Sequence, residues 1–573
     1  MRAKNLERLI DVAQKREAAE LVIKNAKFFN VFTGRFVDGD VAVDGGYIAG
    51  TGRYEGLNEF DAAGAYLTPG FFDGHVHIES GMASPGEFAR ILAACGTTTI
   101  IADPHEIANV AGAAGIEYIL EATEAAPVNV YVMLPSCVPA TPLERGGAKL
   151  DAADLARFMD HPRVLGLGEM MNFPGVLSKD PEVMAKLRLA GGRRIDGHAP
   201  GLSGPALAAY AAAGVRNDHE CSSAAEASER LALGLAVMLR EGSAARNLLH
   251  LLPAVTPDTA PFCFMATDDR HPEDLLGQGS INHLVRLAVK DGRLNLSAIL
   301  KLATLNGPRH FGLTELGAVA PGYRADLALF PDLENFRPAR VWKDGRLAAE
   351  NGRCLYEAGA VDEGKIRAGL KLGPISLDSF KIPARGPHVR VMGLIPGELT
   401  TEHLILSPAA VDGCYVAEPE ADLVKAAVFE RYKGDGRHGL GFLKGLGLKK
   451  GALASTVAHD SHNLVVAGAN DADMLAAAEE IRRIGGGLAV VENKQVLGSL
   501  PLPLGGLMSD RPMEEIRAKL ARMQEAARGL GLREGHDPFM TLAFMSLPVI
   551  PKLKLTEAGL VDVEKFAVVP LTF

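Results

Sequence analysis

Hydrophobic and polar residues alternate in two stretches that lie far apart along the chain. The alternation, interrupted by Gly turns, runs through residues 20–50 and returns in residues 318–347. A period of two is typical of β-strands that bury one face. We therefore predict one small β-sandwich that is built from both flanks, residues 21–67 and 314–360.

Between these flanks, apolar strand-like runs alternate with helix-like stretches. Five of the runs end in polar residues that are described below, and residues 97–103, 129–136 and 236–242 supply three more. Eight strands separated by helices are what a (β/α)8 barrel requires. The fold class is therefore predicted to be α/β, with a TIM-type barrel over residues 68–313 inserted into the β-sandwich.

The two ends of the chain follow other patterns. Residues 1–20 are predicted to form an amphipathic helix, with Leu6, Leu9, Ile10 and Ala13 on one apolar face. Residues 385–573 are predicted to form an additional α/β domain. A length of 573 residues is too great for a single core, so several domains are expected.

Histidines and carboxylates stand at the carboxyl ends of the predicted barrel strands. His75 and His77 are separated by one residue, so their side chains point the same way along an extended strand. The further strand-end residues are Glu169, His198, His219 and Asp268. In a parallel barrel these ends converge on one face, where active sites lie. Singly, such residues are often buried core histidines or helix caps, but six in one register predict a metal site.

The chemistry of the six ligands indicates which ions they would bind. Imidazoles and carboxylates without cysteine suit Zn²⁺, Mn²⁺ or Fe²⁺ and do not choose among them. Six ligands are too many for one tetrahedral catalytic ion, but they suit a pair about 3.5–4 Å apart. We predict two divalent ions, with His75, His77 and Asp268 mainly on one, His198 and His219 on the other, and Glu169 between them.

Several motifs around these ligands resemble those of one known family. The chain resembles the amidohydrolase superfamily and, within it, the adenine deaminases. The resemblance covers the chain after about residue 20, and its most specific part lies in the carboxy-terminal region, which most amidohydrolases lack. The motifs that carry it are residues 103–109, 168–171, 197–202, 239–247, 267–270 and 459–463.

The resemblance implies a reaction and a metal. The expected activity is hydrolytic deamination of adenine to hypoxanthine and ammonia, with a metal-bridging hydroxide as the nucleophile. Coordination makes such a hydroxide available because it lowers the pKa of the bound water to about 7. The resemblance also favours manganese or ferrous iron over zinc, and it implies a barrel inserted in a β-sandwich.

Deamination needs two protons, one at ring N1 and one at the departing amino group. Asp268 is the expected first shuttle, because it can lie beside the attacking water as well as the metal. Several deaminases place a Glu shortly after the strand-five histidine, but here His198 is followed by Ala-Pro-Gly. The candidates for the second proton are therefore Asp103 and Glu106, with Glu169 as a partner. Asp103 precedes a proline, and a simple turn residue is the alternative.

Four further residues are predicted to contact the purine. Arg240 and Ser243 follow strand seven and can hydrogen-bond its edge, although Arg240 can equally pair with a carboxylate. His459 and His462 belong to the carboxy-terminal motif and are expected to reach the active site. A third, structural metal site or a hydrogen-bonded turn are the alternatives for that motif.

The composition and net charge of the chain limit its binding partners and indicate its cellular compartment. A net charge of −10 argues against a nucleic-acid partner, since phosphates require clustered Lys and Arg. Six scattered cysteines without a Cys-x-x-Cys pair indicate a reducing compartment. The charged amino terminus does not resemble a signal peptide, and no stretch is long and apolar enough for a membrane span. We predict a cytoplasmic protein that forms a homodimer or larger homo-oligomer.

Two other functions remain open. The first is hydrolysis of another aminated heterocycle or of a cyclic amide, as in hydantoinases and dihydroorotases. These reactions use the same barrel and a similar pair of metal ions. Cyclic-amide hydrolases are disfavoured because Glu169 occupies the place of their strand-four lysine. A non-catalytic scaffold is disfavoured because all six predicted ligands are present.

Overall fold

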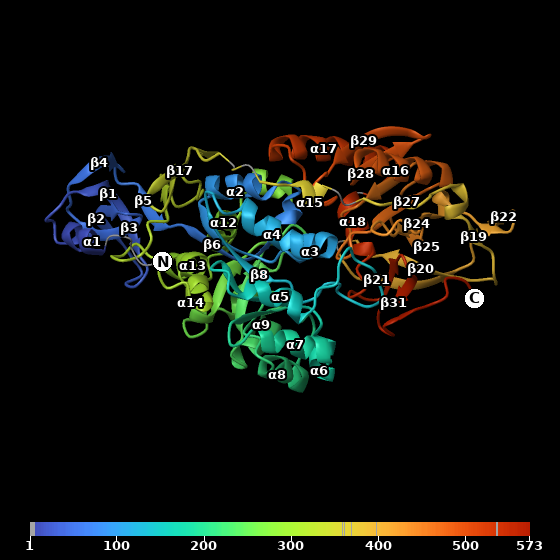
Figure 1. Ribbon diagram of the computed structural model, residues 1–573, viewed down its shortest axis with the longest axis horizontal. Coiled ribbons are helices and arrows are strands. Elements are labelled where there is room, and N and C mark those ends of the chain that lie inside the picture. The colour runs from blue at the N-terminus through green and yellow to red at the C-terminus, as the bar shows by residue number, and fades with distance from the viewer. Residues whose placement is uncertain (1–5, 358, 360, 368–369, 397, 534–536) are drawn as a thin grey trace.

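The chain is arranged as three parts along its longest axis. The computed structural model in Figure 1 describes residues 6–357, 359, 361–367, 370–396, 398–533 and 537–573. A β-sheet lies at one end, a barrel in the middle, and a second α/β part, coloured orange to red, at the other end (Figure 1). The predicted α/β fold class is confirmed. We propose that the parts are domains with the predicted boundaries near residues 68, 313 and 385.

The two flanks of the barrel join in one nine-stranded sheet, with the order β18-β17-β16-β15-β5-β1-β2-β3 and β4 beside β1. Its strands are β1 (Ala19–Asn30), β2 (Arg35–Asp44), β3 (Tyr47–Gly52), β4 (Gly56–Asp61), β5 (Tyr66–Pro69), β15 (Leu327–Phe330), β16 (Arg340–Lys343), β17 (Arg346–Glu350) and β18 (Arg353–Cys354). β5, which leads into the barrel, pairs antiparallel with β15, which follows it. Phe28, Leu67 and Trp342 pack together in its core. The entrance and exit of the barrel are therefore anchored to each other.

The amino-terminal helix is shorter than predicted. Helix α1 spans Leu6–Ala13, β1 begins at Ala19, and residues 1–5 of the predicted helix lie outside the described residues. Lys15 has a φ of 62°, a left-handed conformation that ends helices. The predicted apolar face is confirmed only in part, because Leu9 is buried together with Val12, while Leu6 and Ile10 are exposed and Ala13 is half-buried.

Eight parallel strands form the barrel, as predicted. They are β6 (Phe71–His77), β7 (Thr97–Ala102), β8 (Asn129–Leu134), β9 (Val164–Met170), β10 (Arg194–Gly197), β11 (Asn217–Asp218), β12 (Ala236–Arg240) and β13 (Cys263–Ala266), which continues as β14 (Asp268–Asp269). One ladder runs β10-β9-β8-β7-β6-β14 and another runs β11-β12-β13. Between the ladders, the Gly197 N–H donates to the Asn217 side chain over 2.9 Å. Pairing of β14 with β6 closes the ring.

Alternate residues of the barrel strands face the interior and the surrounding helices. On β7, Ile100 packs toward the helices while Ile101 packs inside with Phe72 and Phe264. Phe311 joins this interior cluster, which leaves the opposite, carboxyl ends of the strands to polar side chains. The helices are α2 (Pro85–Ala94), α3 (His105–Ala111), α4 (Ala113–Ala122), α5 (Ala152–Met159), α6 (Phe173–Ser178), α7 (Pro181–Leu189), α8 (Gly204–Ala212), α9 (Ala224–Ala232), α10 (Leu248–Leu251), α11 (Pro272–Gly277), α12 (Ile281–Asp291), α13 (Leu296–Thr304), α14 (Asn306–Phe311) and, after the barrel, α15 (Gly364–Arg367).

The carboxy-terminal part is built on an eight-stranded sheet with the order β21-β20-β25-β24-β27-β26-β28-β29. Its strands and those beside it are β19 (Ile382–Pro383), β20 (Val389–Leu394), β21 (Thr401–Leu406), β22 (Ala410–Val411), β23 (Cys414–Tyr415), β24 (Leu423–Phe429), β25 (His438–Lys444), β26 (Ala452–Ser455), β27 (Leu464–Gly468), β28 (Gly487–Glu492), β29 (Gln495–Pro501), β30 (Leu553–Thr556), β31 (Gly559–Asp562) and β32 (Ala567–Val568). Three helices accompany them, α16 (Asp471–Ile484), α17 (Met513–Gly529) and α18 (Pro538–Met545).

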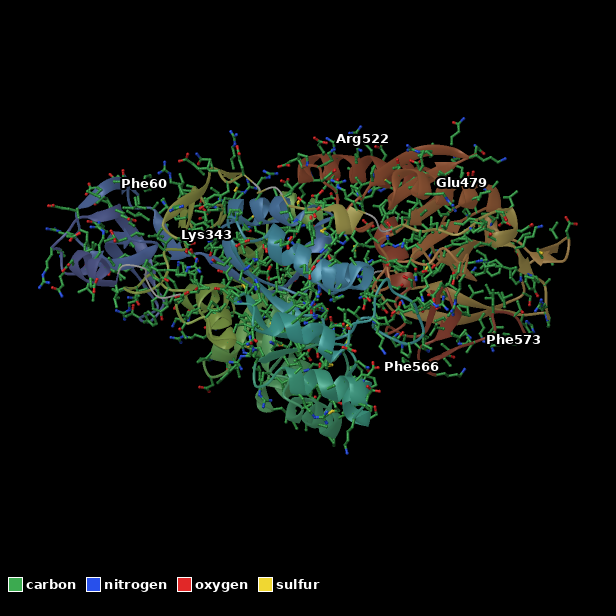
Figure 2. All side chains as sticks on the ribbon, viewed as in Figure 1. Phe60, Lys343, Glu479, Arg522, Phe566 and Phe573 are labelled. Carbon is green, nitrogen blue, oxygen red and sulfur yellow. The ribbon has the colours of Figure 1, made fainter. Side chains whose placement is uncertain are left out.

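Both faces of this sheet are covered. Ala489 of β28 packs with α16, whereas its neighbour Val490 packs in the large cluster that includes α17 and the barrel. The outer sides of the two helices carry exposed charges such as Glu479 and Arg522 (Figure 2). The sheet therefore uses one face to hold α16 and turns the other toward the barrel.

The carboxy-terminal part is attached to the barrel by hydrogen bonds and an ion pair. The Met513 N–H donates to Glu87 over 2.7 Å, and Arg90 pairs with Glu514 over the same distance. These contacts join α17 to α2, beside the carboxyl end of β6. Among the helices in the described part of the chain, none has both the length and the apolar character that crossing a membrane requires.

Candidate metal centre

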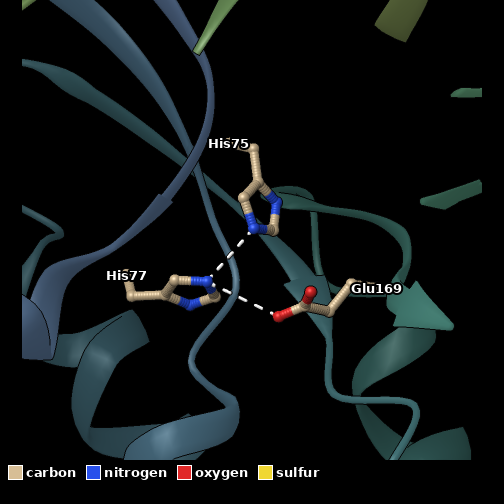
Figure 3. Close-up of side chains that lie close together, drawn as sticks. All are labelled: His75, His77 and Glu169. Atoms are coloured by element: carbon tan, nitrogen blue, oxygen red, sulfur yellow. Dashed lines mark hydrogen bonds and ion pairs between the residues drawn. The ribbon is translucent and has the colours of Figure 1, made fainter. Parts of the chain in front are cut away.

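The six predicted ligands come together at the carboxyl ends of the barrel strands. His75 Nε2 lies 3.1 Å from His77 Nε2, and His77 Nε2 lies 3.5 Å from Glu169 Oε1 (Figure 3). Five of the six side chains are buried, and His198 is partly exposed. Strands β6, β9 and β14 and the residues that directly follow β10 and β11 supply them.

The two oxygens of Glu169 face different histidines. Oε1 faces His77, whereas Oε2 lies 2.6 Å from His198 Nδ1 and 3.2 Å from His219 Nε2. Asp268 stands on the His77 side, with Oδ1 3.1 Å from His77 Nε2 and 3.7 Å from His75 Nε2. The Glu169 carboxylate therefore stands between two sets of side chains that are predicted to be metal ligands.

Both carboxylates remain charged although they are buried. Burial alone raises the pKa of Glu169, but His198, His105 and His219 outweigh it and hold that pKa well below its usual range. Burial likewise raises the pKa of Asp268, and His77 and Arg240 reverse the effect. An ionised carboxylate is the form that binds a cation.

The histidine orientations also fit a metal. The His77 Nδ1–H donates to the carbonyl oxygen of Asp103 over 3.0 Å, so its Nε2 lone pair faces the cluster. The ring of His75 stacks on that of His219, with centroids 4.1 Å apart. Ring nitrogens and charged oxygens that converge in this way are the donor atoms that divalent ions bind in proteins. The donor set therefore fits divalent ions of the kind predicted.

The side chain of Asp103 hydrogen-bonds the backbone of Glu169. Its Oδ2 accepts the Glu169 backbone N–H over 2.8 Å, and its side chain is buried. This approach requires a glycine before Glu169, because a Cβ at Gly168 would lie 2.1 Å from Asp103 Oδ2. The buried contact gives Asp103 a role beyond that of a turn residue.

Replacing Gly168 with Ala is therefore expected to displace Asp103 and to lower kcat/KM for deamination by about 10–100-fold, the usual cost of disturbing a group that orients a metal ligand. Metal retained after dialysis against a chelator should fall in parallel. Gly277→Ala is the matched control, because an added Cβ there meets nothing within 4 Å. Equal activity of both variants would contradict the role of Asp103.

Asp268 is held in position by its backbone and by Arg240. Its φ of 58° is a left-handed conformation that few non-glycine residues adopt and that is often found at functional sites. Arg240 Nη1 donates to Asp268 Oδ2 over 2.9 Å and also to Glu220, while its other N–H groups bond Glu220 and Asn247. All five guanidinium N–H groups thus have protein partners, which leaves Asp268 Oδ1 facing the histidines.

Ser243 lies apart from the ligand cluster. Its hydroxyl donates to Asp274 over 2.6 Å and accepts the His271 backbone N–H over 2.9 Å. It lines a cavity of about 700 Å³ between the barrel loops and the carboxy-terminal part. Contact between Ser243 and substrate stays a prediction.

Two residues of the site were not among the predicted ones. His105 places Nδ1 3.1 Å from Glu169 Oε1 and Nε2 3.4 Å from Glu106 Oε1. Glu220 lies 3.7 Å from His198 Nδ1 and accepts from Arg240. Both were adjacent in sequence to residues that had been singled out, and that adjacency is the signal that could have identified them.

The carboxy-terminal motif also reaches the barrel. His459 and His462 each hydrogen-bond one oxygen of Glu106, at the start of α3. The structure thus brings together all the predicted site residues except Ser243, and it joins them in two connected clusters, one around Glu169 and one around Glu106.

Comparison with known proteins gives matches along almost the whole chain. Residues 66–348 match the amidohydrolase family, and residues 398–567 match the adenine deaminase C-terminal domain. Adenine deaminase 2 of Carboxydothermus hydrogenoformans is 57% identical over 99% of this chain and 100% of its own length. An adenine deaminase of Nitratidesulfovibrio vulgaris is 49% identical over 98% of this chain and 97% of its own. One from Geobacillus kaustophilus is 45% identical over 98% of both chains.

Proposed function

The chain belongs to the adenine deaminase family, and from this membership we propose that its buried cluster of histidines and carboxylates hydrolyses adenine to hypoxanthine and ammonia. Full-length similarity supports the substrate. The observation that carries the site is the division of the two Glu169 oxygens between His77 on one side and His198 with His219 on the other.

We propose that this cluster holds two divalent ions, most favourably Mn²⁺, with Fe²⁺ and Zn²⁺ as alternatives. His75, His77 and Asp268 would hold one ion, His198 and His219 the other, and Glu169 would bind both. When bound, such a pair supplies a nucleophilic water at neutral pH by lowering its pKa to about 7.

Asp268 is proposed to carry the first proton. Arg240 occupies its Oδ2, so Oδ1 is the oxygen that faces the cluster and can accept a proton from the water that adds to C6 of adenine. Delivery of that proton to ring N1, and of a second proton to the amino group, releases ammonia and leaves hypoxanthine. Adenine and water thus account for all atoms of the two products.

The second proton donor stays a proposal among three carboxylates. Glu106 is linked to the cluster through His105, while Asp103 bonds the Glu169 backbone and Glu169 itself faces four imidazoles. Because Arg240 uses its donors on Glu220, Asn247 and Asp268, we propose that it orients these groups around the substrate.

The wider setting is also proposed. All six cysteines are free, which supports a reducing, cytoplasmic compartment. Exposed apolar side chains near the carboxyl end, including Phe566 and Phe573 (Figure 2), support a homo-oligomer. The partner of the site would be a small purine, with neither nucleic acid nor membrane involved.

Ammonia release from adenine by the purified chain tests the function. The metal-free chain is expected to be inactive, and activity should rise with added Mn²⁺ until about two equivalents per chain are bound. Saturation at one equivalent would contradict the paired site. Two bound ions without ammonia release would reject adenine and direct the search to other aminated heterocycles and cyclic amides.

A further inference from the structure

A loop of the carboxy-terminal part encloses a carboxylate of the barrel. Residues 456–463 connect β26 to β27, and two of them, His459 and His462, bond the two oxygens of Glu106; we name this pair the histidine clamp. Glu106 and His462 are almost fully buried, and His459 is nearly so. More than 350 residues separate the partners in sequence, so the contact exists only when the two parts of the chain are docked.

The hydrogen bonds of His462 fix the position of its proton. The Ala458 backbone N–H donates to His462 Nδ1 over 3.1 Å, and a backbone N–H can only donate. Nδ1 is therefore the acceptor, and the single proton of the neutral ring is on Nε2, which faces Glu106. Burial lowers the pKa of His462 to about 4, which agrees with a neutral ring.

This proton argues against the alternative of a third metal at the clamp. Glu106, His459 and His462 have the composition of a metal site, but an Nε2 that carries a proton has no lone pair for an ion. Glu106 instead accepts one N–H at each oxygen, as a buried carboxylate requires. Burial raises the pKa of Glu106, but the two histidines reverse the effect and keep it well below its usual range.

The clamp is held by its own surroundings. Arg431 bonds the carbonyl oxygen of His462 and that of Gly505, and Tyr432 donates to the carbonyl oxygen of Ser461. Asn463 donates to the carbonyl oxygen of Arg145, in the barrel part, over 2.9 Å. The two imidazoles are therefore fixed relative to α3.

One residue connects the clamp to the metal centre. His105 lies between Glu106, 3.4 Å from its Nε2, and Glu169, 3.1 Å from its Nδ1. Without a charged Glu106, His105 Nε2 would lose its nearest carboxylate, because Asp460 lies 4.0 Å away, and the ring would be held less firmly against Glu169.

We infer that His459 and His462 are positioning residues for deamination: they hold Glu106 in place, Glu106 orients His105 against Glu169, and the active site is complete only when the carboxy-terminal part is docked on the barrel. The inference rests on the proposed function. It assigns the motif a role through Glu106, in place of the direct contact with the purine that the sequence suggested.

Paired substitutions at each histidine test this role. His462→Gln and His459→Asn keep an N–H near the original donor, whereas His462→Leu and His459→Leu remove it. The Leu variants are expected to lose about 10–100-fold in kcat, with KM changed by less than about threefold and two metal equivalents retained. The Gln and Asn variants should recover most of the loss. Ser461→Ala, in the same loop but without contact to Glu106, is the matched control and should retain activity.

A double-mutant cycle separates action through Glu106 from other roles. If the clamp acts through Glu106, adding His462→Leu to Glu106→Gln should cost little beyond the single change. Additive losses, or a rise in KM with kcat unchanged, would overturn the inference in favour of substrate contact. Loss of a metal equivalent would overturn it in favour of an ion at the clamp.

Crystal structures of the metal-loaded His462→Leu and His462→Gln variants provide a test that does not depend on adenine. His105 should leave Glu169 in the Leu variant and keep its place in the Gln variant. An unmoved His105 in His462→Leu would overturn the inference, whereas an inactive native chain would reject only the proposed function.

Discussion

Replacing Glu169 with Gln is expected to lower adenine turnover by more than about 10³-fold and to leave at most one firmly bound divalent ion. Disturbing the outer partners of metal ligands already costs about 10–100-fold, and Glu169 is the carboxylate proposed to bind both ions. An amide has one oxygen to offer, so Gln would direct an NH2 group either at His77 or at His198 and His219. Metal analysis by mass spectrometry and initial rates with excess Mn²⁺ measure the two effects.

Glu241→Gln is the matched control for this change. Glu241 is also a buried glutamate after a barrel strand, but its carboxylate accepts the Leu248 backbone N–H and belongs to no histidine cluster among the described residues. Its variant should bind two ions and stay within a few-fold of the native rate. Retention of two tightly bound ions by the Glu169 variant would show that the carboxylate does not bridge them.

The ligand cluster was predictable because it depends on local order and on one rule of barrels. A run such as residues 71–77 indicates a strand by its apolar pattern, and the parallel barrel then brings every strand end to one face. His198 and His219 follow short strands of four and two residues, yet the closed ring places them against Glu169 all the same. No knowledge of loop conformation is needed for this step.

Contacts that depend on loop conformation, or on how the carboxy-terminal part docks on the barrel, could not be predicted from this rule. Arg240 could equally bind substrate or carboxylates, and only the structure shows that its donors are used by Glu220, Asn247 and Asp268. His105 falls on the first turn of α3, so its direction is set by how that helix leaves β7. The clamp on Glu106 requires the placement of the carboxy-terminal part on the barrel, which no pattern within either segment specifies.

The amino-terminal helix illustrates a further limit. Its apolar residues allow more than one face, and the sequence alone favoured a face that includes Leu6 and Ile10. Packing against Val22 and Ala49 of the sheet buries Leu9, as predicted, but Val12 joins it in place of Leu6 and Ile10. Tertiary contacts thus decide the orientation of a short helix whose own pattern is ambiguous.

Replacing Asp268 with Asn is expected to lower kcat by about 10³-fold, within the 10²–10⁴-fold range of general acid–base catalysis, while metal binding is weakened only modestly. Asn keeps an oxygen that can face His77, and its NH2 group replaces the oxygen that Arg240 bonds. It cannot take a proton from water and return it to the purine. Metal content, kcat and KM measured at saturating Mn²⁺ separate the loss of proton transfer from a loss of ligation.

A control variant and a contrary result test whether Asp268 carries the proton. Asp274→Asn alters a carboxylate in the helix that follows the same strand, where it bonds Ser243, and it should change kcat by only a few-fold. If the Asp268→Asn variant instead loses an ion in proportion to its loss of activity, Asp268 acts only as a ligand. The first proton must then be carried by another group that faces the cluster, and His105, held between Glu106 and Glu169, would be the next candidate to test.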